Sequence, residues 1–320
     1  MFNYLSVLLY YNIGSMQEAE FIWMDGKLVK WNEAKIHLLT HSLHYGTAVF
    51  EGIRCYDTPK GSAIFRLKDH VKRLLNSQHI VGMDCGYSAK ELEQACKQVV
   101  KENKLKECYV RPLIYYGYGS MGIDTRKAPV NVGIAAFNFP SYLGKEGLDK
   151  GIRAKVSSFT RPHPNTMMTK AKVSGNYANS TFAKMEALNS GFQEAIILDS
   201  QGYVSECSAE NLFISKQGKL VTPPVLNALE GITRNSIIEI ARKEFKVEVE
   251  ESLFTRDQLY IADEVFLSGT AAEVTPIVEV DNRKIGSGKP GELTKKIQGF
   301  FFDVARGRKP KYSAWLELVK

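Results

Sequence analysis

The first half of the chain shows hydrophobic positions at both strand and helix spacing. Two short apolar-rich segments flank Asp25-Gly26, a pair typical of a tight β-hairpin turn. From Leu67 onward, apolar residues recur at helical spacing, and Ser88 with Glu91 forms a capping box before another helical run. The expected elements are strands at residues 21–24, 27–30, 109–116 and 130–139, and a helix at 92–104.

The second half mixes the same two periods. A helical pattern over residues 176–190 ends at Gly191, a residue type that commonly follows a helix C-terminus. Gly231 and Thr255 precede two further expected helices, and the last helix is expected at 293–305. Strands are expected at residues 152–157, 195–198, 211–215 and 265–267. Helices and strands are mixed in both halves without an internal repeat, which predicts an α/β or α+β fold.

The length of 320 residues and a change in composition after residue 139 predict two domains. We expect a small α/β domain at 16–138, an interdomain loop at 139–147 and a larger, cofactor-binding domain at 148–320. Residues 1–15 carry no motif, and Met16 begins a more ordinary leader directly before the first strand. We therefore expect residues 1–15 to be an extension upstream of the true start or a poorly ordered tail.

Charge and cysteine content argue against several classes of protein. The net charge is +7, but the basic residues are scattered, which argues against a nucleic-acid partner. The apolar run at residues 5–11 is too short to span a membrane. The five cysteines are irregularly spaced without a C-x-x-C motif, so we expect neither a disulfide framework nor a zinc site. These features predict a cytoplasmic protein whose partners are small molecules.

Residues 169–177 form the segment that carries the most chemical information. A lysine there precedes a Ser-Gly turn that opens the helical run at residues 176–190. An amine held at such a boundary can form an imine with an aldehyde cofactor, and Tyr177 can lie beside the same ring. On this segment alone, the favoured interpretation is that Lys170 and Lys172 are two solvated surface lysines.

Two short segments are suited to an anion such as a phosphate. Ile232 and Thr233 follow a glycine at the start of an expected helix, where backbone N–H groups and a hydroxyl can hold a phosphate. Thr270 and Ala271 follow a buried strand and present small residues with free N–H groups. Arg66, directly after an expected strand, could supply a fixed positive charge. Ordinary helix capping and turn formation are the alternative explanation for these segments.

Two glutamates, Glu206 and Glu210, lie among small residues between expected strands, an unusual position for solvated acids. If the aldehyde cofactor is pyridoxal 5′-phosphate, a buried carboxylate beside its ring nitrogen is needed to keep that nitrogen protonated, so that the ring can accept electrons. Either glutamate could have this role.

Two other patterns are better explained by ordinary local structure than by a binding site. Residues 117–122 match G-x-G-x-x-G, but no helical pattern follows, so a flexible loop is favoured over a dinucleotide site. The histidines at positions 37, 41 and 44 lie on different sides of a short turn, which favours hydrogen bonds within the fold over metal binding.

Six segments, taken in order, resemble a known family. They are Phe50-Glu51-Gly52-Ile53-Arg54, Tyr109-Val110-Arg111-Pro112-Leu113, and residues 172–177, 206–213, 231–234 and 268–273. Together they are similar to the class IV (fold type IV) pyridoxal-phosphate aminotransferases, and within them to the branched-chain amino acid aminotransferases. The similarity extends from about residue 20 to the C-terminus. It implies two α/β domains with pyridoxal 5′-phosphate in the cleft between them, and a homodimer or hexamer with loops that cross between subunits.

The resemblance also implies roles for individual residues. Lys172 corresponds to the lysine that forms the Schiff base, Glu206 to the partner of the ring nitrogen and Tyr177 to the partner of the ring 3-hydroxyl. The implied phosphate site consists of Arg66, Ile232, Thr233 and Thr270. The implied substrate site consists of Tyr109, Arg111, Thr270, Ala271 and an apolar wall formed by Tyr45, Phe50, Phe139 and Tyr142.

The implied reaction is a reversible, ping-pong transamination of leucine, isoleucine or valine with 2-oxoglutarate, in branched-chain amino acid biosynthesis. A D-amino acid aminotransferase and an aminodeoxychorismate lyase use the same lysine and glutamate, and they stay open as alternatives. A catalytically silent protein that binds the cofactor is a more remote alternative.

Overall fold

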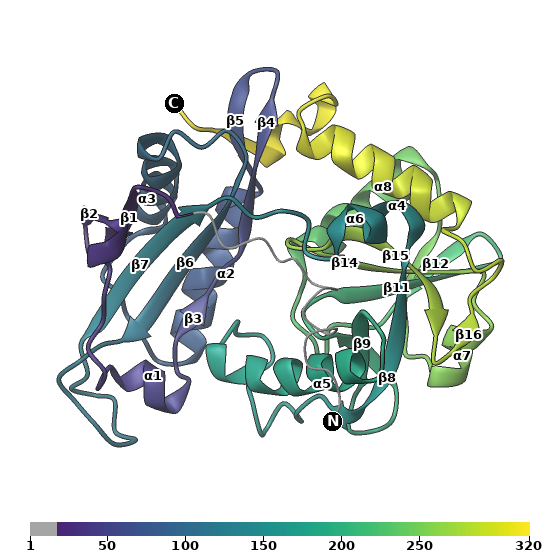
Figure 1. The fold of residues 1–320 in the computed structure, drawn as a ribbon, viewed down its shortest axis with the longest axis horizontal. Coiled ribbons are helices and arrows are strands. Elements are labelled where there is room, and N and C mark those ends of the chain that lie inside the picture. Colours follow the sequence, from purple (N-terminus) through teal and green to yellow (C-terminus); the bar gives the residue numbers. More distant parts are fainter. Residues whose placement is uncertain (1–17) are drawn as a thin grey trace, which may run out of the picture.

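The computed structural model describes residues 18–320, which form two β-sheets surrounded by helices (Figure 1). The expectation for residues 1–15 falls outside the described residues. None of the described helices is long and apolar enough to cross a membrane. All five cysteines are free thiols, and all are buried.

The first sheet has the strand order β17-β5-β4-β6-β7-β1-β2, with β3 paired to β6, and its neighbours are antiparallel. Its strands are β1 (Phe21–Met24), β2 (Lys27–Lys30), β3 (Val49–Phe50), β4 (Ile53–Thr58), β5 (Gly61–Phe65), β6 (Cys108–Tyr116), β7 (Val130–Phe137) and β17 (Leu316–Leu318). The helices in this part of the chain are α1 (His41–Tyr45), α2 (Leu67–Ile80) and α3 (Ala89–Glu102).

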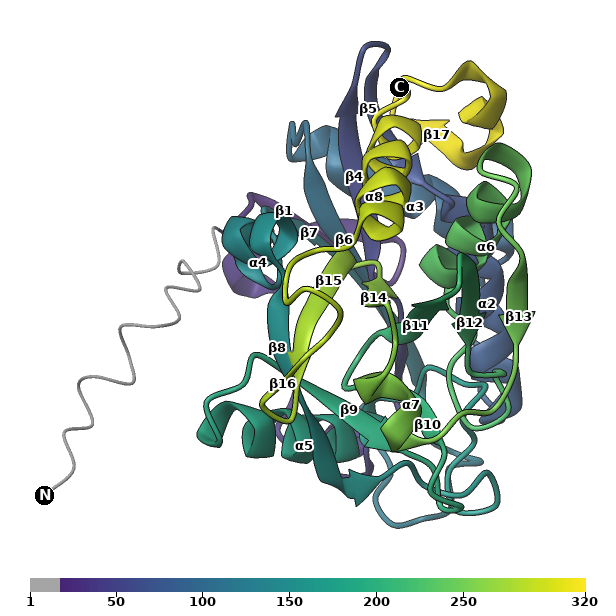
Figure 2. The same cartoon turned by 90° about the vertical axis from the view of Figure 1, so that its right-hand side faces the viewer.

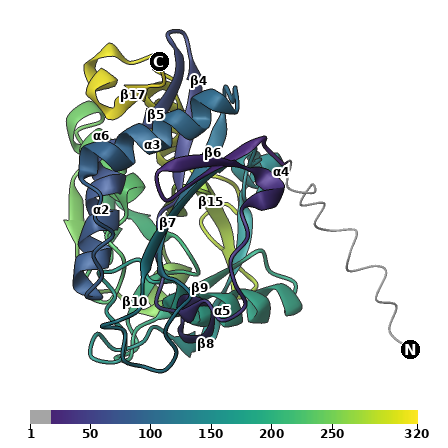
Figure 3. The same ribbon diagram turned by 90° about the vertical axis from the view of Figure 1, so that its left-hand side faces the viewer.

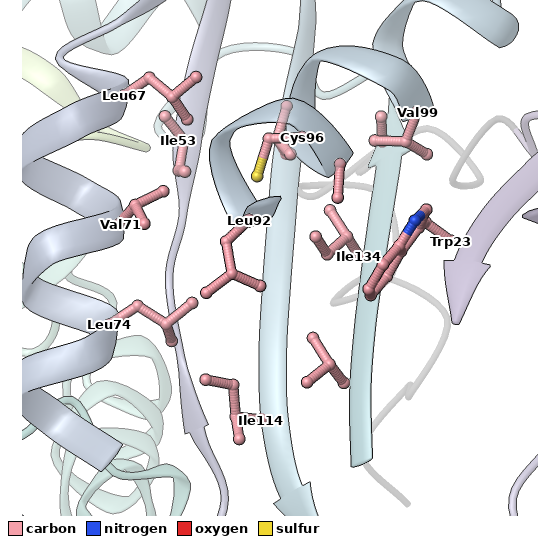
Figure 4. Packing of buried hydrophobic residues seen from close by; sticks show 14 of the residues in the cluster. Trp23, Ile53, Leu67, Val71, Leu74, Leu92, Cys96, Val99, Ile114 and Ile134 are labelled. Carbon is pink, nitrogen blue, oxygen red and sulfur yellow. The ribbon is translucent and has the colours of Figure 1, made fainter. Parts of the chain in front are cut away.

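One face of the first sheet packs against α2 and α3 (Figure 3). Leucine, valine and cysteine side chains from the two helices face apolar residues of the strands, including Ile53, Ile114, Ile134 and Trp23 (Figure 4). Each such fully buried aliphatic side chain contributes roughly 1.5–3 kcal/mol to the hydrophobic driving force. This core holds α2 rigidly beside the sheet.

The second sheet has the order β10-β9-β8-β15-β14-β11-β12-β13, with β16 paired to β15, and it contains both parallel and antiparallel pairs. Its strands are β8 (Ile152–Thr160), β9 (Glu194–Leu198), β10 (Val204–Cys207), β11 (Asn211–Lys216), β12 (Lys219–Thr222), β13 (Val249–Glu251), β14 (Glu264–Gly269), β15 (Glu273–Val280) and β16 (Arg283–Lys284). Its helices are α4 (Gly144–Lys150), α5 (Tyr177–Asn189), α6 (Ile232–Glu244), α7 (Arg256–Tyr260) and α8 (Glu292–Ala305). Three 3-10 helices complete the described elements: η1 (Trp31–Glu33), η2 (Ser174–Asn176) and η3 (Pro310–Trp315).

The two sheets share part of their packing. Helices α6 and α8 lie against β14 of the second sheet (Figure 2). Tyr56 and Phe65 of the first sheet belong to the same buried cluster as Phe213, Phe266 and Phe301. In addition, β17 near the C-terminus pairs with β5, so the chain returns to the sheet where it began. The boundary at residues 139–147 stays a prediction.

Several elements agree with the local sequence signals. The Asp25-Gly26 hairpin and the capping box of Ser88 with Glu91 are both present. The helix at Tyr177–Asn189 is followed closely by Gly191 with φ of +81°. The expected strand at residues 130–139 ends earlier, at Phe137.

Two local expectations were wrong. Helix α4 begins at Gly144, within the segment that we expected to be a loop. The sequence pattern did not predict this helix because it has only seven residues and no buried apolar stripe. Glu206 lies inside strand β10 instead of between strands. All four residues of that strand are buried, so it lacks the alternation that would reveal a half-buried strand.

Candidate active site

A cavity of about 220 Å³ is lined by residues from both sheets and from the start of α6. It collects most of the residues implied by the sequence. From that set, the lining contains Lys172, Tyr177, Glu206, Ile232, Thr233, Thr270, Ala271, Tyr109, Arg111, Phe50, Phe139 and Tyr142.

The structure separates the two candidate lysines. The backbone of Lys172 is held on both sides, because its N–H donates to Ser77 Oγ at 3.0 Å and its carbonyl accepts from Phe50 N at 3.1 Å. Its Nζ lies in the cavity, 2.5 Å from the Tyr177 hydroxyl. Lys170 is exposed, donates to the carbonyl of Val225 and does not line the cavity.

The two candidate glutamates are both buried, but they have different partners. Glu206 Oε1 lies 2.8 Å from Arg161 Nε. Burial raises the pKa of Glu206, and the positive charges of Arg161 and Lys172 oppose that rise. Burial and the charge of Glu194 raise the pKa of Glu210 to about 8. Because only Glu206 has a direct cationic partner, it is the glutamate better suited to carry a negative charge near neutral pH.

Arg161 is itself fixed by the wall of the cavity. Its Nη1 donates to Asn179 Oδ1 at 3.0 Å and to Ser180 Oγ at 2.9 Å. Its Nη2 donates to the carbonyls of Cys207 and Ser208 at 2.7 and 2.9 Å. The guanidinium therefore cannot move away from Glu206 without losing these hydrogen bonds.

The start of α6 forms one end of the cavity. Gly231 is the N-cap, and no side chain caps the helix. A Cβ at this position would lie 1.9 Å from Asn211 Oδ1, so the close approach of Asn211 requires glycine. Uncapped N–H groups at a helix N-terminus attract an anion, and Ile232 and Thr233 line the cavity at this end.

The structure does not bring Arg66 to the cavity, contrary to the sequence interpretation. Its guanidinium contacts Asp69, donates to Ser236 Oγ at 3.0 Å and lies over the Trp315 ring. Arg73 lines the cavity instead. Arg66 is the N-cap of α2, whereas Arg73 lies two turns into the same helix, about 10 Å further along its axis.

The apolar wall consists of aromatic side chains in contact with one another. The ring centroids of Tyr109 and Phe139 are 5.0 Å apart, and Arg111 lies over Phe50 with its guanidinium carbon 5.0 Å from the ring centroid. A Cβ at position 52 would lie 1.8 Å from the Tyr109 hydroxyl, so glycine there makes room for this ring.

Tyr45, which the resemblance assigns to the apolar wall, does not line the cavity of its own chain. It is 41% exposed, packs on the His41 ring and accepts a hydrogen bond from Gly122 N at 3.2 Å. It lies on the short helix α1, which the sequence pattern did not predict.

Unpartnered polar atoms show that the cavity is built for a polar ligand. Within residues 18–320, five buried side-chain nitrogen or oxygen atoms have no hydrogen-bond partner, and all five belong to cavity-lining residues. They are Arg111 Nε, Arg161 Nε, Asn176 Oδ1, Glu210 Oε1 and Ser268 Oγ. Arg161 Nε is compensated by the nearby charge of Glu206, although the pair lacks hydrogen-bond geometry. Buried polar atoms are costly without partners, so such a concentration indicates a ligand with both donors and acceptors.

The alternative patterns have ordinary explanations in the structure. The glycine-rich loop at residues 117–122 leads into strand β7, whereas a dinucleotide fingerprint must open a helix. His41 and His44 contact the carbonyls of Gly122 and Leu38 through Nε2. In the described part of the chain, no group of His, Cys, Asp or Glu is arranged to hold a metal ion.

Three functional candidates were missed by the sequence reasoning: Arg73, Arg161 and Ser268. Ser268 opens the Ser-Gly-Thr-Ala segment that we did identify, so its position was available as a signal. The two arginines had no such signal, because basic residues are scattered along the chain and only packing shows which ones turn inward.

Comparison with known proteins places this geometry in a family. The family model for class IV aminotransferases matches residues 48–280. A branched-chain-amino-acid aminotransferase of Pseudomonas aeruginosa is 50% identical over 93% of this chain and 97% of its own length. The relative from Escherichia coli K12 is 47% identical over 95% of this chain and 98% of its own.

Solved structures agree with the sequence relatives. The Escherichia coli branched-chain amino acid aminotransferase superposes with a TM-score of 0.92 at 47% identity, covering 95% of this chain and all of that one. The T.th. enzyme with pyridoxamine 5′-phosphate gives the same TM-score and identity, covering 95% of this chain and 99% of its own. The expected fold class is thereby confirmed. The chain belongs to the class IV aminotransferases and, within them, to the branched-chain-amino-acid aminotransferase family.

Proposed function

We propose that this enzyme transfers the amino group of leucine, isoleucine or valine reversibly to 2-oxoglutarate, giving branched-chain 2-oxo acids and L-glutamate. The observation that carries this proposal is the placement of the Lys172 amine. It lies in a cavity that also holds a buried glutamate, a helix N-terminus suited to phosphate and an aromatic wall. The relatives at 47–50% identity are both named branched-chain-amino-acid aminotransferases.

The residues of the cavity fit pyridoxal 5′-phosphate. Lys172 Nζ would bind the aldehyde carbon, Glu206 the ring nitrogen and Tyr177 the ring hydroxyl. The phosphate would lie against Ile232, Thr233 and Thr270, with Arg73 in the place we first gave to Arg66. The bound cofactor supplies an electron sink that stabilises negative charge at the substrate Cα. Glu206 supports this chemistry, because its carboxylate, paired with Arg161, can keep a ring proton in place.

Lys172 would also move the proton. Once its amine is free, it could accept the proton from the substrate Cα as a general base and return it, as a general acid, to the carbon of the cofactor that carried the aldehyde. The Tyr177 hydroxyl lies at hydrogen-bond distance from this amine and holds its position. The aromatic wall contacts this amine, since the Phe50 ring centroid is 4.9 Å from Lys172 Nζ.

The substrate would be held by its two ends. Tyr109 and the Thr270-Ala271 turn would bind the α-carboxylate, and Phe50, Phe139 and Tyr142 would surround an apolar side chain. Glutamate needs a cation in the same region, and Arg111 offers its buried, unpartnered Nε. Solved forms of the T.th. relative contain N-(5′-phosphopyridoxyl)-L-glutamate or 4-methylvaleric acid, so one protein binds a ligand with an acidic side chain and a carboxylic acid with a branched apolar chain.

We also propose that the enzyme is a homodimer or a larger assembly of dimers. Large apolar side chains are exposed together on the segment before and within α1 and on the loop that contacts it: Ile36, Leu38, Leu39, Leu43, Tyr118, Met121 and Ile123. An exposed apolar patch of this kind marks an association surface. Tyr45 lies on the same surface and does not line the cavity of its own chain. Because the resemblance implies loops that cross between subunits, we propose that Tyr45 reaches the cavity of the partner. Sedimentation of the full chain would test this, and a monomer at working concentration would contradict it.

A panel of amino donors with 2-oxoglutarate tests the proposed reaction. We expect leucine, isoleucine and valine to be turned over well, and the protein to bind pyridoxal 5′-phosphate at one site per chain. Preference for D-amino acids would indicate a D-amino acid aminotransferase, and activity with aminodeoxychorismate would indicate a lyase. Cofactor binding without turnover of any donor would indicate a silent binding protein.

A further inference from the structure

A buried carboxylate behind the cavity wall receives two hydrogen bonds from Arg73. Arg73 Nε donates to Glu51 Oε1 at 2.6 Å, and Nη2 donates to Glu51 Oε2 at 2.9 Å. Glu51 is 0% exposed, and Oε2 also lies 2.7 Å from Nδ1 of the buried His70. The bidentate arrangement fixes the plane of the guanidinium as well as its position.

The remaining side of Arg73 faces the start of α6. Its Nη1 donates to the carbonyl of Glu230 at 2.7 Å, one residue before the N-cap Gly231. A guanidinium has five N–H donors, and these contacts use three of them. Because Arg73 also lines the cavity, the other donors are available to an anion at the start of α6.

The contacts of Glu51 and His70 determine the protonation state of each side chain. Burial alone would raise the pKa of Glu51, but the positive charge of Arg73 and the hydrogen bonds from Arg73 and His70 hold that pKa well below its ordinary value. Burial lowers the pKa of His70, so its ring is neutral and donates Nδ1–H to the carboxylate, which can only accept. Glu51 is therefore a permanently charged anchor across the working pH range.

An anchored arginine binds an anion better than a free one. A mobile arginine loses side-chain conformational freedom when it is ordered by a ligand, and this loss weakens binding. In this structure Glu51 has already ordered it. The segment that carries Glu51 has a second connection to the site, because the neighbouring Phe50 N–H donates to the carbonyl of Lys172.

We propose that Glu51 is a positioning residue that orients Arg73 toward the phosphate group of the cofactor, and thereby sets the preference of this protein for phosphorylated pyridoxal over unphosphorylated pyridoxal. The inference rests on the proposed function, in which the phosphate lies against the start of α6. A purely structural Glu51 would instead act on both forms of the cofactor alike, through Phe50 and Lys172.

The test is a pair of binding titrations on the full chain after removal of cofactor. Pyridoxal 5′-phosphate and pyridoxal are each titrated while tryptophan fluorescence and cofactor absorbance are followed. We expect Glu51→Gln to weaken binding of the phosphate form by about ten- to a hundredfold, the range for a lost charge-assisted contact. Binding of pyridoxal should hardly change. Arg73→Gln should give the same pattern, and the double variant should add little further loss, because both changes remove one interaction.

A matched control is available in Glu107, which forms another two-point contact with an arginine. Arg306 donates to its two oxygens at 3.0 and 3.1 Å, and neither residue lines the cavity. Glu107→Gln should leave both affinities as they are. If Glu51→Gln leaves Arg73 unpaired and the chain does not fold, Glu51→Asp decides the question. It keeps the charge, but its shorter side chain cannot meet both guanidinium nitrogens, so an intermediate loss for the phosphate form alone is expected.

Equal losses for pyridoxal and its phosphate in Glu51→Gln or Glu51→Asp would overturn the inference and leave Glu51 a structural role. A variant that binds both forms as tightly as the unmodified protein also leaves the preference unchanged, and it would overturn the inference as well. A different result would concern the proposed function itself: if the unmodified protein binds the two forms equally, the phosphate site is misplaced. The wild-type titration therefore distinguishes the two failures.

Discussion

Replacing Arg111 with methionine tests how one cavity can accept both leucine and glutamate. Arg111 lies on the aromatic wall with its guanidinium carbon 5.0 Å from the Phe50 centroid and 5.4 Å from that of Tyr109. Its buried Nε has no hydrogen-bond partner, and Arg111 forms no ion pair within the described residues. We therefore expect the arginine to bind a ligand carboxylate, because it serves no ion pair within the described residues.

The magnitude follows from what each substrate loses. In the Arg111→Met variant, a bound glutamate side chain loses its charged hydrogen bond with the guanidinium. Such a bond is worth about 1.5–3 kcal/mol, or roughly ten- to a hundredfold in affinity. The contact of the guanidinium with the two rings is worth about 0.5–1 kcal/mol, but its loss affects both substrates and cancels in their ratio. Methionine is long and unbranched, so it can fill the space without a large cavity.

Single-turnover absorbance measurements read the two half-reactions separately. We expect Arg111→Met to slow the half-reaction with glutamate or 2-oxoglutarate by about ten- to a hundredfold more than the half-reaction with leucine. Arg111→Lys keeps the charge without the planar fork, so it should retain part of the glutamate reaction. Equal losses for both substrates would refute the assignment and indicate that Arg111 only supports the wall.

Three further predictions concern the reactive groups. Lys172→Ala should abolish turnover and the visible absorbance of bound cofactor, whereas Lys170→Ala should retain both; borohydride reduction and peptide mapping that label Lys170 would contradict this. Glu206→Gln should lower kcat by at least roughly a hundredfold, and steady-state kinetics that show this loss for Glu210→Gln instead would exchange their roles. Because folding raises the pKa of Glu210 from 4.5 to about 8, the folded state keeps a proton that the unfolded chain releases, so stability should fall as pH rises through that range. Glu210→Gln should reduce this fall in thermal unfolding, and an unchanged pH profile would show that Glu210 is ionised in the folded protein.

Signals confined to a few neighbouring residues were read correctly from the sequence. The Asp25-Gly26 hairpin, the Ser88–Glu91 capping box and the helix that begins at Tyr177 depend on contacts between residues close in sequence. The short helices α1 and α4 left too little periodicity to be recognised.

The order of the six motifs along the chain gave information that no single motif contains. It led to the family, and through the family to the two candidate positions Lys172 and Glu206. The identity of the family is confirmed by the comparisons, whereas the individual roles stay predictions.

The sequence by itself determined the family, the class of fold and most of the residue types that the chemistry needs. Only the tertiary structure decided between residues of equal type: Arg73 over Arg66 for the cavity, and Arg161 beside Glu206 but not beside Glu210. It also placed Tyr45 outside its own cavity and Glu51 behind Arg73. The physical reason is that charge and polarity are properties of a side chain, whereas burial and pairing depend on chain segments far apart in sequence. Glu51 and Arg73 are separated by 22 residues and Arg54 and the Thr270 carbonyl by 216, and no local pattern reports such contacts.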